Sequence, residues 1–382
     1  MTKKTVTKKT VTTNRIADAR RLIVKIGSSL LVDEASGHIR RAWMDSLCDD
    51  VARCRARGQE IILVSSGAVA VGRRHLGLTP PLRLEEKQAA AATGQIRLAH
   101  AYQEALARHG ITVAQVLLTL ADSEDRRRFL NARNTLDTLL RLGAVPVINE
   151  NDTVATTEIR FGDNDRLAAR VAQMSGADAL VLFSDIDGLY TADPRKNADA
   201  RLLPEVREIT PEIEAMAGDP GSAFGSGGMV TKLAAAKISL SAGCRMAICK
   251  GEPLHPLTAL ENGATVTWFL PSAGPMTARK QWIAGSMSAM GSLHLDDGAV
   301  RALASGKSLL PAGIRAIDGE FDRGDCVQMV NGDGRVIGRG LSAYSAADAR
   351  LIMGRKSTDI ESVLGFRGRD EIIHRDDLVM EG

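Results

Sequence analysis

Short apolar segments alternate with longer amphipathic segments through the first two thirds of the chain. The apolar segments are nearly continuous, which is typical of strands buried on both faces of a parallel sheet. A Gly closes or follows each amphipathic segment, as expected at helix ends. The predicted strands are 22–26, 60–64, 144–148, 179–183 and 245–249, and the predicted helices are 41–57, 84–108, 123–142, 165–175 and 229–242. This alternation predicts a three-layer αβα domain with a mostly parallel central sheet.

The pattern changes after FLPSAGPMTARKQW (269–282), which is rich in Pro, Gly and Ala. Beyond it, short apolar runs are separated by turn signals such as Asp318-Gly319 and Arg323-Gly324. This spacing predicts a small β-rich barrel or sandwich. We therefore expect domains at 16–273 and 279–382.

Charge and composition narrow the class of protein. Hydrophobic residues make up 44% and charged residues 25% of 382 residues, which is ordinary for a globular protein. No apolar run approaches the roughly 18 residues of a membrane helix, so no membrane association is expected. The net charge of +3 arises in residues 1–15, which carry five basic and no acidic side chains, leaving 3 − 5 = −2 for the rest. We expect 1–15 to be a disordered basic tail without a secretory signal. Weak nucleic-acid contact and an uncertain start site are the alternatives.

The cysteines and histidines give no sign of a disulfide framework or a metal site. Five cysteines without a Cys-x-x-Cys pair fit buried thiols in a reducing cytoplasm. The seven histidines lack zinc-ligand spacing.

Polar residues follow four of the predicted strands. Any one of these groups could be turn chemistry. Because carboxyl ends of parallel strands meet at one edge of the sheet, the four together predict a ligand cleft. They are Lys25 with Gly27-Ser28-Ser29, Ser65-Ser66-Gly67-Ala68, Asn149-Glu150-Asn151-Asp152, and Ser184-Asp185 with Asp187-Gly188.

Two Gly-rich segments are candidates for phosphate binding. Gly306-Lys307-Ser308 resembles part of a Walker A motif, but Arg301 stands where its first Gly belongs, and we reject it. GSGGMVTKLAAAKISL (225–240) opens a helix whose N–H groups favour an anion, with Lys232 one turn inside. A flexible helix entry is the alternative.

These features favour phosphoryl transfer, which relies on positioning and charge stabilisation with Mg²⁺ on the phosphates. No His-based triad is evident. A carboxylate acceptor needs no base, because its pKa of about 4.3 leaves it ionised near neutral pH. In EIRFGDNDRLAARVAQ (158–173), a helix cap explains one of the consecutive residues Asp163, Asn164 and Asp165 and leaves two for a ligand.

The chain resembles the glutamate 5-kinase family from about residue 20 to 380. The motifs, in order, are VKIGSSL, VSSGAVAVGR, FLNARNTL, VPVINENDTV, GDNDRLAA, DGLYTADPR, GSGGMVTK and HRDD. Members have the amino-acid-kinase fold with a C-terminal PUA-type barrel and phosphorylate the side-chain carboxylate of L-glutamate in proline biosynthesis. Aspartate and acetylglutamate kinases share the fold and the DGLYTADPR-like segment. They do not combine the INEND and GDND motifs with a C-terminal PUA-type barrel.

The resemblance implies roles for individual residues. Lys25 and Lys232 would neutralise the transferring phosphoryl group, and Asp165 would orient both lysines without acting as a base. No protein ligand for a metal is predicted. The implied glutamate-binding residues are Ser66, Asn149, Asp152 and Asn164, with Gly67 and Asp163 close by; the implied ATP-binding residues are Lys25, Ser184, Asp185, Ser226, Gly227, Gly228, Met229, Val230, Thr231 and Lys232.

The resemblance also implies ATP and Mg²⁺ as cofactors, a cytoplasmic location, feedback inhibition by proline, and dimers or tetramers. The lability of acyl phosphates suggests glutamyl-phosphate reductase as a partner. PUA-type barrels often bind RNA, but residues 279–382 hold 14 basic and 15 acidic side chains, which argues against an RNA partner.

Substrate choice within the fold rests on few residues. A kinase for another carboxylate or for acetylated glutamate is the rival, and Asp152 and Asp163 favour glutamate because they could meet its free ammonium group. Arg160 stands where Lys is common in the family, which could alter a substrate-loop contact. Ser184 replaces a common Thr and keeps the hydroxyl.

Overall fold

The computed structural model describes residues 15–33, 36–154, 163–217, 228–285 and 289–381. By their contacts these residues form two units. The first comprises the described residues up to Glu124 together with Ala132–Ser272, and the second comprises Asp125–Asn131 and the residues from Ala273 onward. The predicted tail, apart from Arg15, lies outside the described residues.

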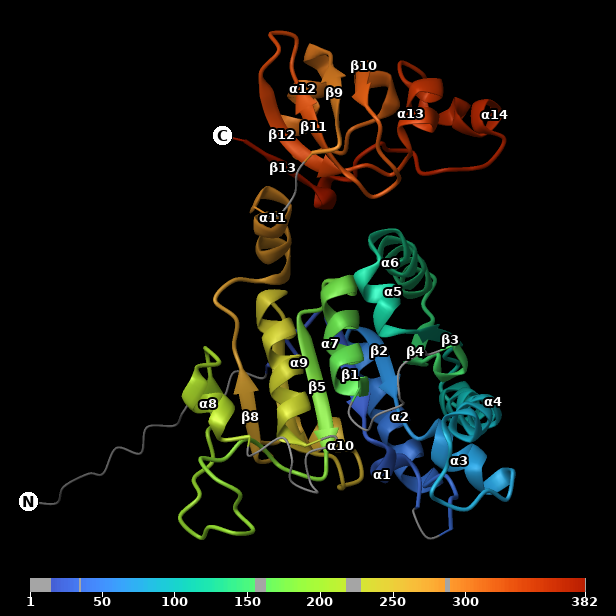
Figure 1. Ribbon diagram of the computed structural model, residues 1–382, viewed down its shortest axis with the longest axis vertical. Helices are drawn as coiled ribbons and strands as arrows, with labels where there is room; N and C mark the ends of the chain where they lie inside the picture. Colours follow the sequence, from blue (N-terminus) through green and yellow to red (C-terminus); the bar gives the residue numbers. More distant parts are fainter. Residues whose placement is uncertain (1–14, 34–35, 155–162, 218–227, 286–288, 382) are drawn as a thin grey trace, which may run out of the picture. The chain divides into compact units, whose positions relative to one another are not determined.

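The first unit is built on a sheet of eight strands in the described part of the chain (Figure 1). The strand order is β3-β4-β2-β1-β5-β7-β8-β6, and every neighbouring pair is parallel except β7 with β8. The prediction of a mostly parallel sheet is therefore confirmed. The strands are β1 (Arg21–Ile26), β2 (Glu60–Ser65), β3 (Val113–Leu118), β4 (Val145–Glu150), β5 (Ala179–Ser184), β6 (Glu205–Val206), β7 (Arg245–Lys250) and β8 (Val266–Phe269).

Successive side chains of a strand point to opposite faces of the sheet. Helices cover both faces and pack against these side chains. Leu22 and Val24 of β1 belong to the main apolar core together with residues of α2 and α4. Lys25, on the opposite face of the same strand, reaches Asp165 of α7, and α7 packs against α9. Figure 1 shows α7 and α9 running alongside β5. The helices are α1 (Ser28–Leu31), α2 (Arg41–Ala56), α3 (Ala68–His75), α4 (Leu84–Ala107), α5 (Leu120–Glu124), α6 (Arg126–Arg141), α7 (Asp163–Ser175), α8 (Pro211–Ala215), α9 (Met229–Ser241) and α10 (Pro256–Glu261). Of these, α6 begins within Asp125–Asn131, which belongs to the second unit.

Several elements differ from the sequence predictions. The strands β3, β6 and β8 and the helices α1, α3, α8 and α10 were not predicted, and one predicted helix is divided. The strand β3 was missed because it lies at the sheet edge, where its side chains are only partly buried and Gln115 interrupts the apolar run. The helix predicted at 123–142 is two helices, α5 and α6. The carboxylate of Asp125 accepts a hydrogen bond from the backbone N–H of Arg128 (2.8 Å), so it starts a new helix in the way an N-cap does.

Glycine allows α3 and α4 to pack closely. A Cβ atom on Gly72 would lie 1.8 Å from the carbonyl oxygen of Ala90, and one on Gly94 would lie 1.8 Å from that of Ala68. Only hydrogen fits at these two crossing points, so α3 is fixed directly after the end of β2.

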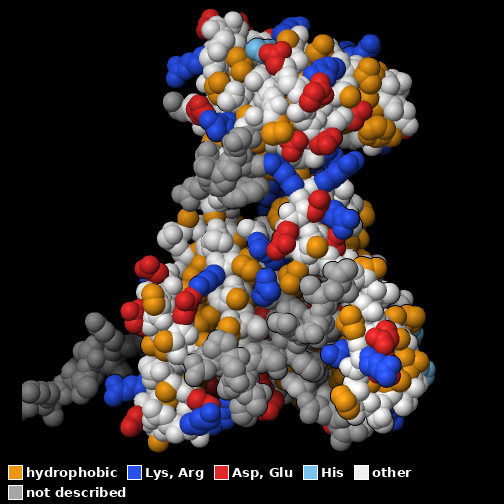
Figure 2. Space-filling model, in the orientation of Figure 1, with side chains coloured by type: hydrophobic (Ala, Val, Ile, Leu, Met, Phe, Trp, Pro, Cys, Tyr) orange, Lys and Arg blue, Asp and Glu red, His pale blue; other side chains and the backbone are white. Residues whose placement is uncertain are grey.

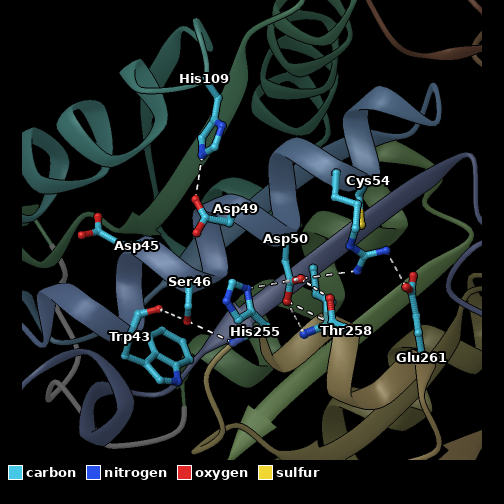
Figure 3. A network of polar contacts seen from close by, with 12 residues as sticks. Trp43, Asp45, Ser46, Asp49, Asp50, Cys54, His109, His255, Thr258 and Glu261 are labelled. Carbon is cyan, nitrogen blue, oxygen red and sulfur yellow. Dashed lines mark hydrogen bonds and ion pairs between the residues drawn. The ribbon is translucent and has the colours of Figure 1, made fainter.

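Asp50 ties α2 to α10, although some 200 residues separate them in sequence (Figure 3). Its carboxylate accepts hydrogen bonds from the backbone N–H groups of Leu257 (2.8 Å) and Thr258 (3.1 Å) and from the Thr258 hydroxyl. His255, which precedes the helix with φ of 54°, donates its backbone N–H to Ser46 Oγ (3.1 Å). The first turn of α10 is therefore capped by a side chain from another helix.

The second unit contains a five-stranded sheet in order β10-β9-β11-β12-β13, in which only β9 with β11 is parallel among the described pairs. This confirms the β-rich prediction. On the face that Figure 2 shows, its basic and acidic side chains are interspersed. Its elements are α11 (Pro275–Gly285), β9 (Gly291–Leu295), α12 (Asp297–Ala304), β10 (Ile314–Gly319), β11 (Cys326–Val330), β12 (Val336–Leu341), α13 (Ala346–Ile352), α14 (Ile360–Leu364) and β13 (Leu378–Met380).

None of the helices within the described ranges combines the length and the apolar character that crossing a membrane requires.

Candidate active site

The carboxyl ends of β1, β2, β4, β5 and β7 border a cleft of about 1330 Å³ in the first unit. All four strand ends singled out in the sequence contribute to its lining, as the parallel sheet requires. The predicted site residues that line it are Lys25, Ser66, Gly67, Asn149, Asp152, Asn164, Ser184, Asp185, Gly228, Met229, Val230 and Lys232.

Asp165 joins the two predicted catalytic lysines. Its Oδ1 lies 2.6 Å from Lys25 Nζ, and its Oδ2 lies 3.2 Å from Lys232 Nζ. The Thr231 hydroxyl also donates to Oδ2 (3.2 Å). The Asp165 side chain is fully buried, while 9% of Lys25 and 6% of Lys232 remain exposed toward the cleft. One carboxylate thus holds two ammonium groups at the floor of the cleft.

The charges of this cluster support one another. Burial raises the pKa of Asp165, but the ammonium groups of Lys25 and Lys232 together lower it by more, so that it lies below its ordinary value. Asp165 is therefore an anion at neutral pH, and a carboxylate so strongly held by cations is a poor proton acceptor.

Asn164 organises the part of the cleft at β2 and β4. Its Nδ2 donates to Ser66 Oγ (2.8 Å) and approaches Asn149 Oδ1 (3.3 Å). Gly67 turns the chain after β2 with φ of 95°, and a Cβ atom there would lie 3.0 Å from Val32 Cγ2. Asn149 Nδ2 and Asn164 Oδ1 are buried without a hydrogen-bond partner among the described residues. A polar ligand in the cleft could satisfy both this donor and this acceptor.

The part of the cleft at β5 and β7 carries different groups. The Ser184 hydroxyl donates to Asp185 Oδ1 (2.9 Å), and the Tyr190 hydroxyl donates to Asp187 Oδ2 (3.1 Å). Gly228 is the residue that precedes α9, and it has no side chain with which to cap this helix. The first N–H groups of a helix are the ones that can bind an anion.

For some predicted site residues, the structure describes neither backbone nor side chain, or only the backbone. Ser226 and Gly227 lie outside the described residues, as does Arg160. Asp163 is the first residue of α7, but its side chain is not among those described. Thr231 contacts Asp165 from α9.

Several charged lining residues were not singled out in the sequence. Arg73 and Lys87 come from α3 and α4, whose approach to the cleft cannot be read from strand ends. Lys196 follows the DGLYTADPR segment. Lys250 directly follows the predicted strand at 245–249, so the rule used for the other four strand ends would have found it.

Comparison with known proteins agrees with this fold. The family model for the amino acid kinase family matches residues 20–250, and that for the PUA domain matches 291–364. A protein from Paramagnetospirillum magneticum named glutamate 5-kinase is 75% identical, over 96% of this chain and 99% of its own. The chain belongs to the amino acid kinase family. Within this family, proteins of the same name from Rhodospirillum rubrum and Agrobacterium fabrum are 61% and 56% identical, over 94% and 97% of this chain and 96% of each of theirs. The resemblance stated from the motifs is confirmed.

Proposed function

We propose that this protein transfers the terminal phosphoryl group of ATP to the side-chain carboxylate of L-glutamate, giving L-glutamyl 5-phosphate and ADP, the first step of proline biosynthesis. The observation that carries the proposal is the buried Asp165 holding Lys25 and Lys232 between the two polar parts of the cleft. The names of the relatives at 56–75% identity support the same activity.

The proposed reaction needs no general base. An oxygen of the glutamate side-chain carboxylate attacks the terminal phosphorus, the bond to the oxygen bridging the second phosphate breaks, and ADP leaves with that electron pair. Lys25 and Lys232 stabilise the negative charge on the moving group, and Asp165 keeps both ammonium groups in place throughout. The acceptor is already ionised at neutral pH.

ATP would lie over β5 and β7, with its phosphates at Ser184, Asp185 and the start of α9. The described residues contain no group of three or more His, Cys, Asp or Glu side chains that could hold a metal. Mg²⁺ in such sites is usually held by the substrate phosphates with one or two carboxylates, and Asp185 and Asp187 line this part of the cleft. Bound there, Mg²⁺ would neutralise phosphate charge.

L-glutamate would lie over β2 and β4. Its carboxylate and ammonium groups suit the unpaired Asn149 Nδ2 and Asn164 Oδ1, and the buried Asp152 adds a negative charge for a free ammonium. An acetylated amine would not gain from that charge, which favours glutamate over N-acetylglutamate.

We infer the remaining properties from the family alone. They are a cytoplasmic location, feedback inhibition by proline, assembly into dimers or tetramers, and transfer of the labile product to glutamyl-phosphate reductase. The absence of any effect of the reductase on product loss would count against the last of these.

The test is ATP consumption with hydroxylamine, which traps an acyl phosphate as a hydroxamate. We expect hydroxamate from L-glutamate and neither from N-acetylglutamate nor from L-aspartate. Hydroxamate from another acceptor alone would keep the reaction and change the substrate. No hydroxamate with any of the three would contradict the proposed function.

A further inference from the structure

Lys250 is a further cation at the carboxyl edge of the sheet, on the side away from the proposed glutamate site. It is the last residue of β7 and pairs in register with Ser184, the last residue of β5. The next residue, Gly251, donates its backbone N–H to the Ser184 carbonyl (2.9 Å). The order β4-β2-β1-β5-β7 thus places Lys250 beside Ser184 and Asp185 and two strands from Lys25.

The present partner of Lys250 is a weak one. Its Nζ lies 2.8 Å from Glu252 Oε2, and the two side chains are 46% and 64% exposed. Ion pairs this exposed contribute little, because water and salt screen them. The hydrogen bond to Glu252 raises the pKa of Lys250, and the charges of Asp187 and Asp185 raise it further, so the ammonium group is charged at neutral pH.

We propose that Lys250 binds the phosphate chain of the nucleotide, exchanging Glu252 for a phosphate oxygen when ATP enters the cleft. This rests on the proposed function, which puts ATP over β5 and β7. Asp165 fixes Lys25 and Lys232 at the proposed point of transfer. Lys250 is not so fixed and lines the same cleft one strand beyond Ser184, so it faces phosphates that stay on the leaving ADP.

A contact with those phosphates is made equally in the bound substrate and during transfer. Such uniform binding lowers KM without changing kcat. Lys250→Ala should therefore raise KM for ATP about tenfold, as expected for a charge-assisted hydrogen bond that is partly exposed. The kcat and the KM for L-glutamate should stay within about twofold.

The experiment measures equilibrium binding of ATP, ADP and adenosine with MgCl₂ present and glutamate absent. The variants are Lys250→Ala, Lys250→Arg and Lys237→Ala, the last as a matched control. Lys237 is also an exposed lysine paired with an acid, Glu214, but it does not line the cleft. We expect Lys250→Ala to weaken ATP and ADP about tenfold and adenosine not at all. Added KCl should shrink the difference from wild type, because salt screens exposed charges. Arg should restore most of the affinity, and the control should match wild type.

Two results would overturn the assignment of Lys250. One is a Lys250→Ala protein that binds ATP and ADP as wild type does, which would leave the Glu252 contact a surface ion pair. The other is an equal loss for adenosine, which would place the contact at the ribose or base. A wild-type protein that binds neither ATP nor ADP would overturn the proposed function itself, and the wild-type titration separates that failure from the first two.

Discussion

Asp165 and Asp50 are two carboxylates of the first unit with nearly equal burial, at 0% and 1% exposure. Asp50 accepts hydrogen bonds from the first turn of α10, and its neighbour Arg53 (3.4 Å) also pairs with Glu261 (2.6 Å). Its partners are fixed parts of the fold. Asp165 instead meets two lysines whose ammonium groups line an open cleft.

The difference between these clusters lies in where their positive charge is directed. The donors of the first turn of α10 point at Asp50, so this contact holds two helices together (Figure 3). Around Asp165, one carboxylate faces two cations, and the excess positive charge faces the cleft. Burial of an acid is therefore no sign of function unless its partners also reach a ligand site.

The largest expected effect separates the cations of the two clusters. Lys25→Met should lower kcat by about 10²- to 10³-fold, because it removes one of the charges that stabilise the transferring phosphoryl group. Arg53→Met removes a cation beside Asp50 and should leave kcat within about threefold. Hydroxamate formation at saturating ATP and L-glutamate measures both. An equal loss in the two variants would contradict the distinction.

The second expected effect is on stability, which should depend on Asp50. Asp50→Asn should lower the free energy of unfolding by about 2–3 kcal/mol, since hydrogen bonds to a charged acceptor are lost from a buried helix start. Asp49→Asn is the matched control, because the partners of Asp49 are partly exposed and such pairs contribute about 1 kcal/mol or less. Urea unfolding measures both. Equal destabilisation by the two variants would count against the capping role.

A third effect uses the thiols of α2 as reporters. Cys48 and Cys54 are buried, and burial is the chief cause that raises the pKa of Cys48 to about 12, so both should resist iodoacetamide at pH 8. Asp50→Asn should speed their alkylation by about tenfold by making local opening easier. Peptide mapping of the labelled protein gives the rate at each thiol. A rate that Asp50→Asn leaves unchanged would mean that α2 does not depend on this contact.

The smallest expected effect is a change in the free energy of unfolding that occurs only at acidic pH. The folded-state pKa of Asp165 lies below its ordinary value of 3.8, so the ionised group stabilises the fold above that pH, and this stabilisation is lost as the pH falls below 3.8 toward the folded-state pKa. The difference in unfolding free energy between wild type and Asp165→Asn should therefore shrink from pH 6 to pH 3. A difference that stays constant or grows over this range would contradict the lowered pKa.

The two clusters also differ in how far the sequence predicts them. The strand ends and the consecutive polar residues at 163–165 are local signals, so the cleft and a ligand site at 163–165 could be expected before the structure was known, while the role of Asp165 among them came from the family resemblance. Asp50 could not, because its role depends on an approach between α2 and α10 that no local pattern encodes. Lys250 could be predicted in part. The sequence shows that it directly follows a predicted strand, but only the pairing of β5 with β7 in the structure shows that it lies beside Ser184.

The most direct test of the account is the single-turnover rate of glutamyl hydroxamate formation in Asp165→Asn and Asp50→Asn, with both proteins saturated with ATP and L-glutamate. The rate is compared per folded molecule, so binding and folding do not enter. We predict a rate at least about 10²-fold below wild type for Asp165→Asn, and a wild-type rate for Asp50→Asn. A wild-type rate in Asp165→Asn would contradict the claim that this carboxylate positions the two lysines for phosphoryl transfer.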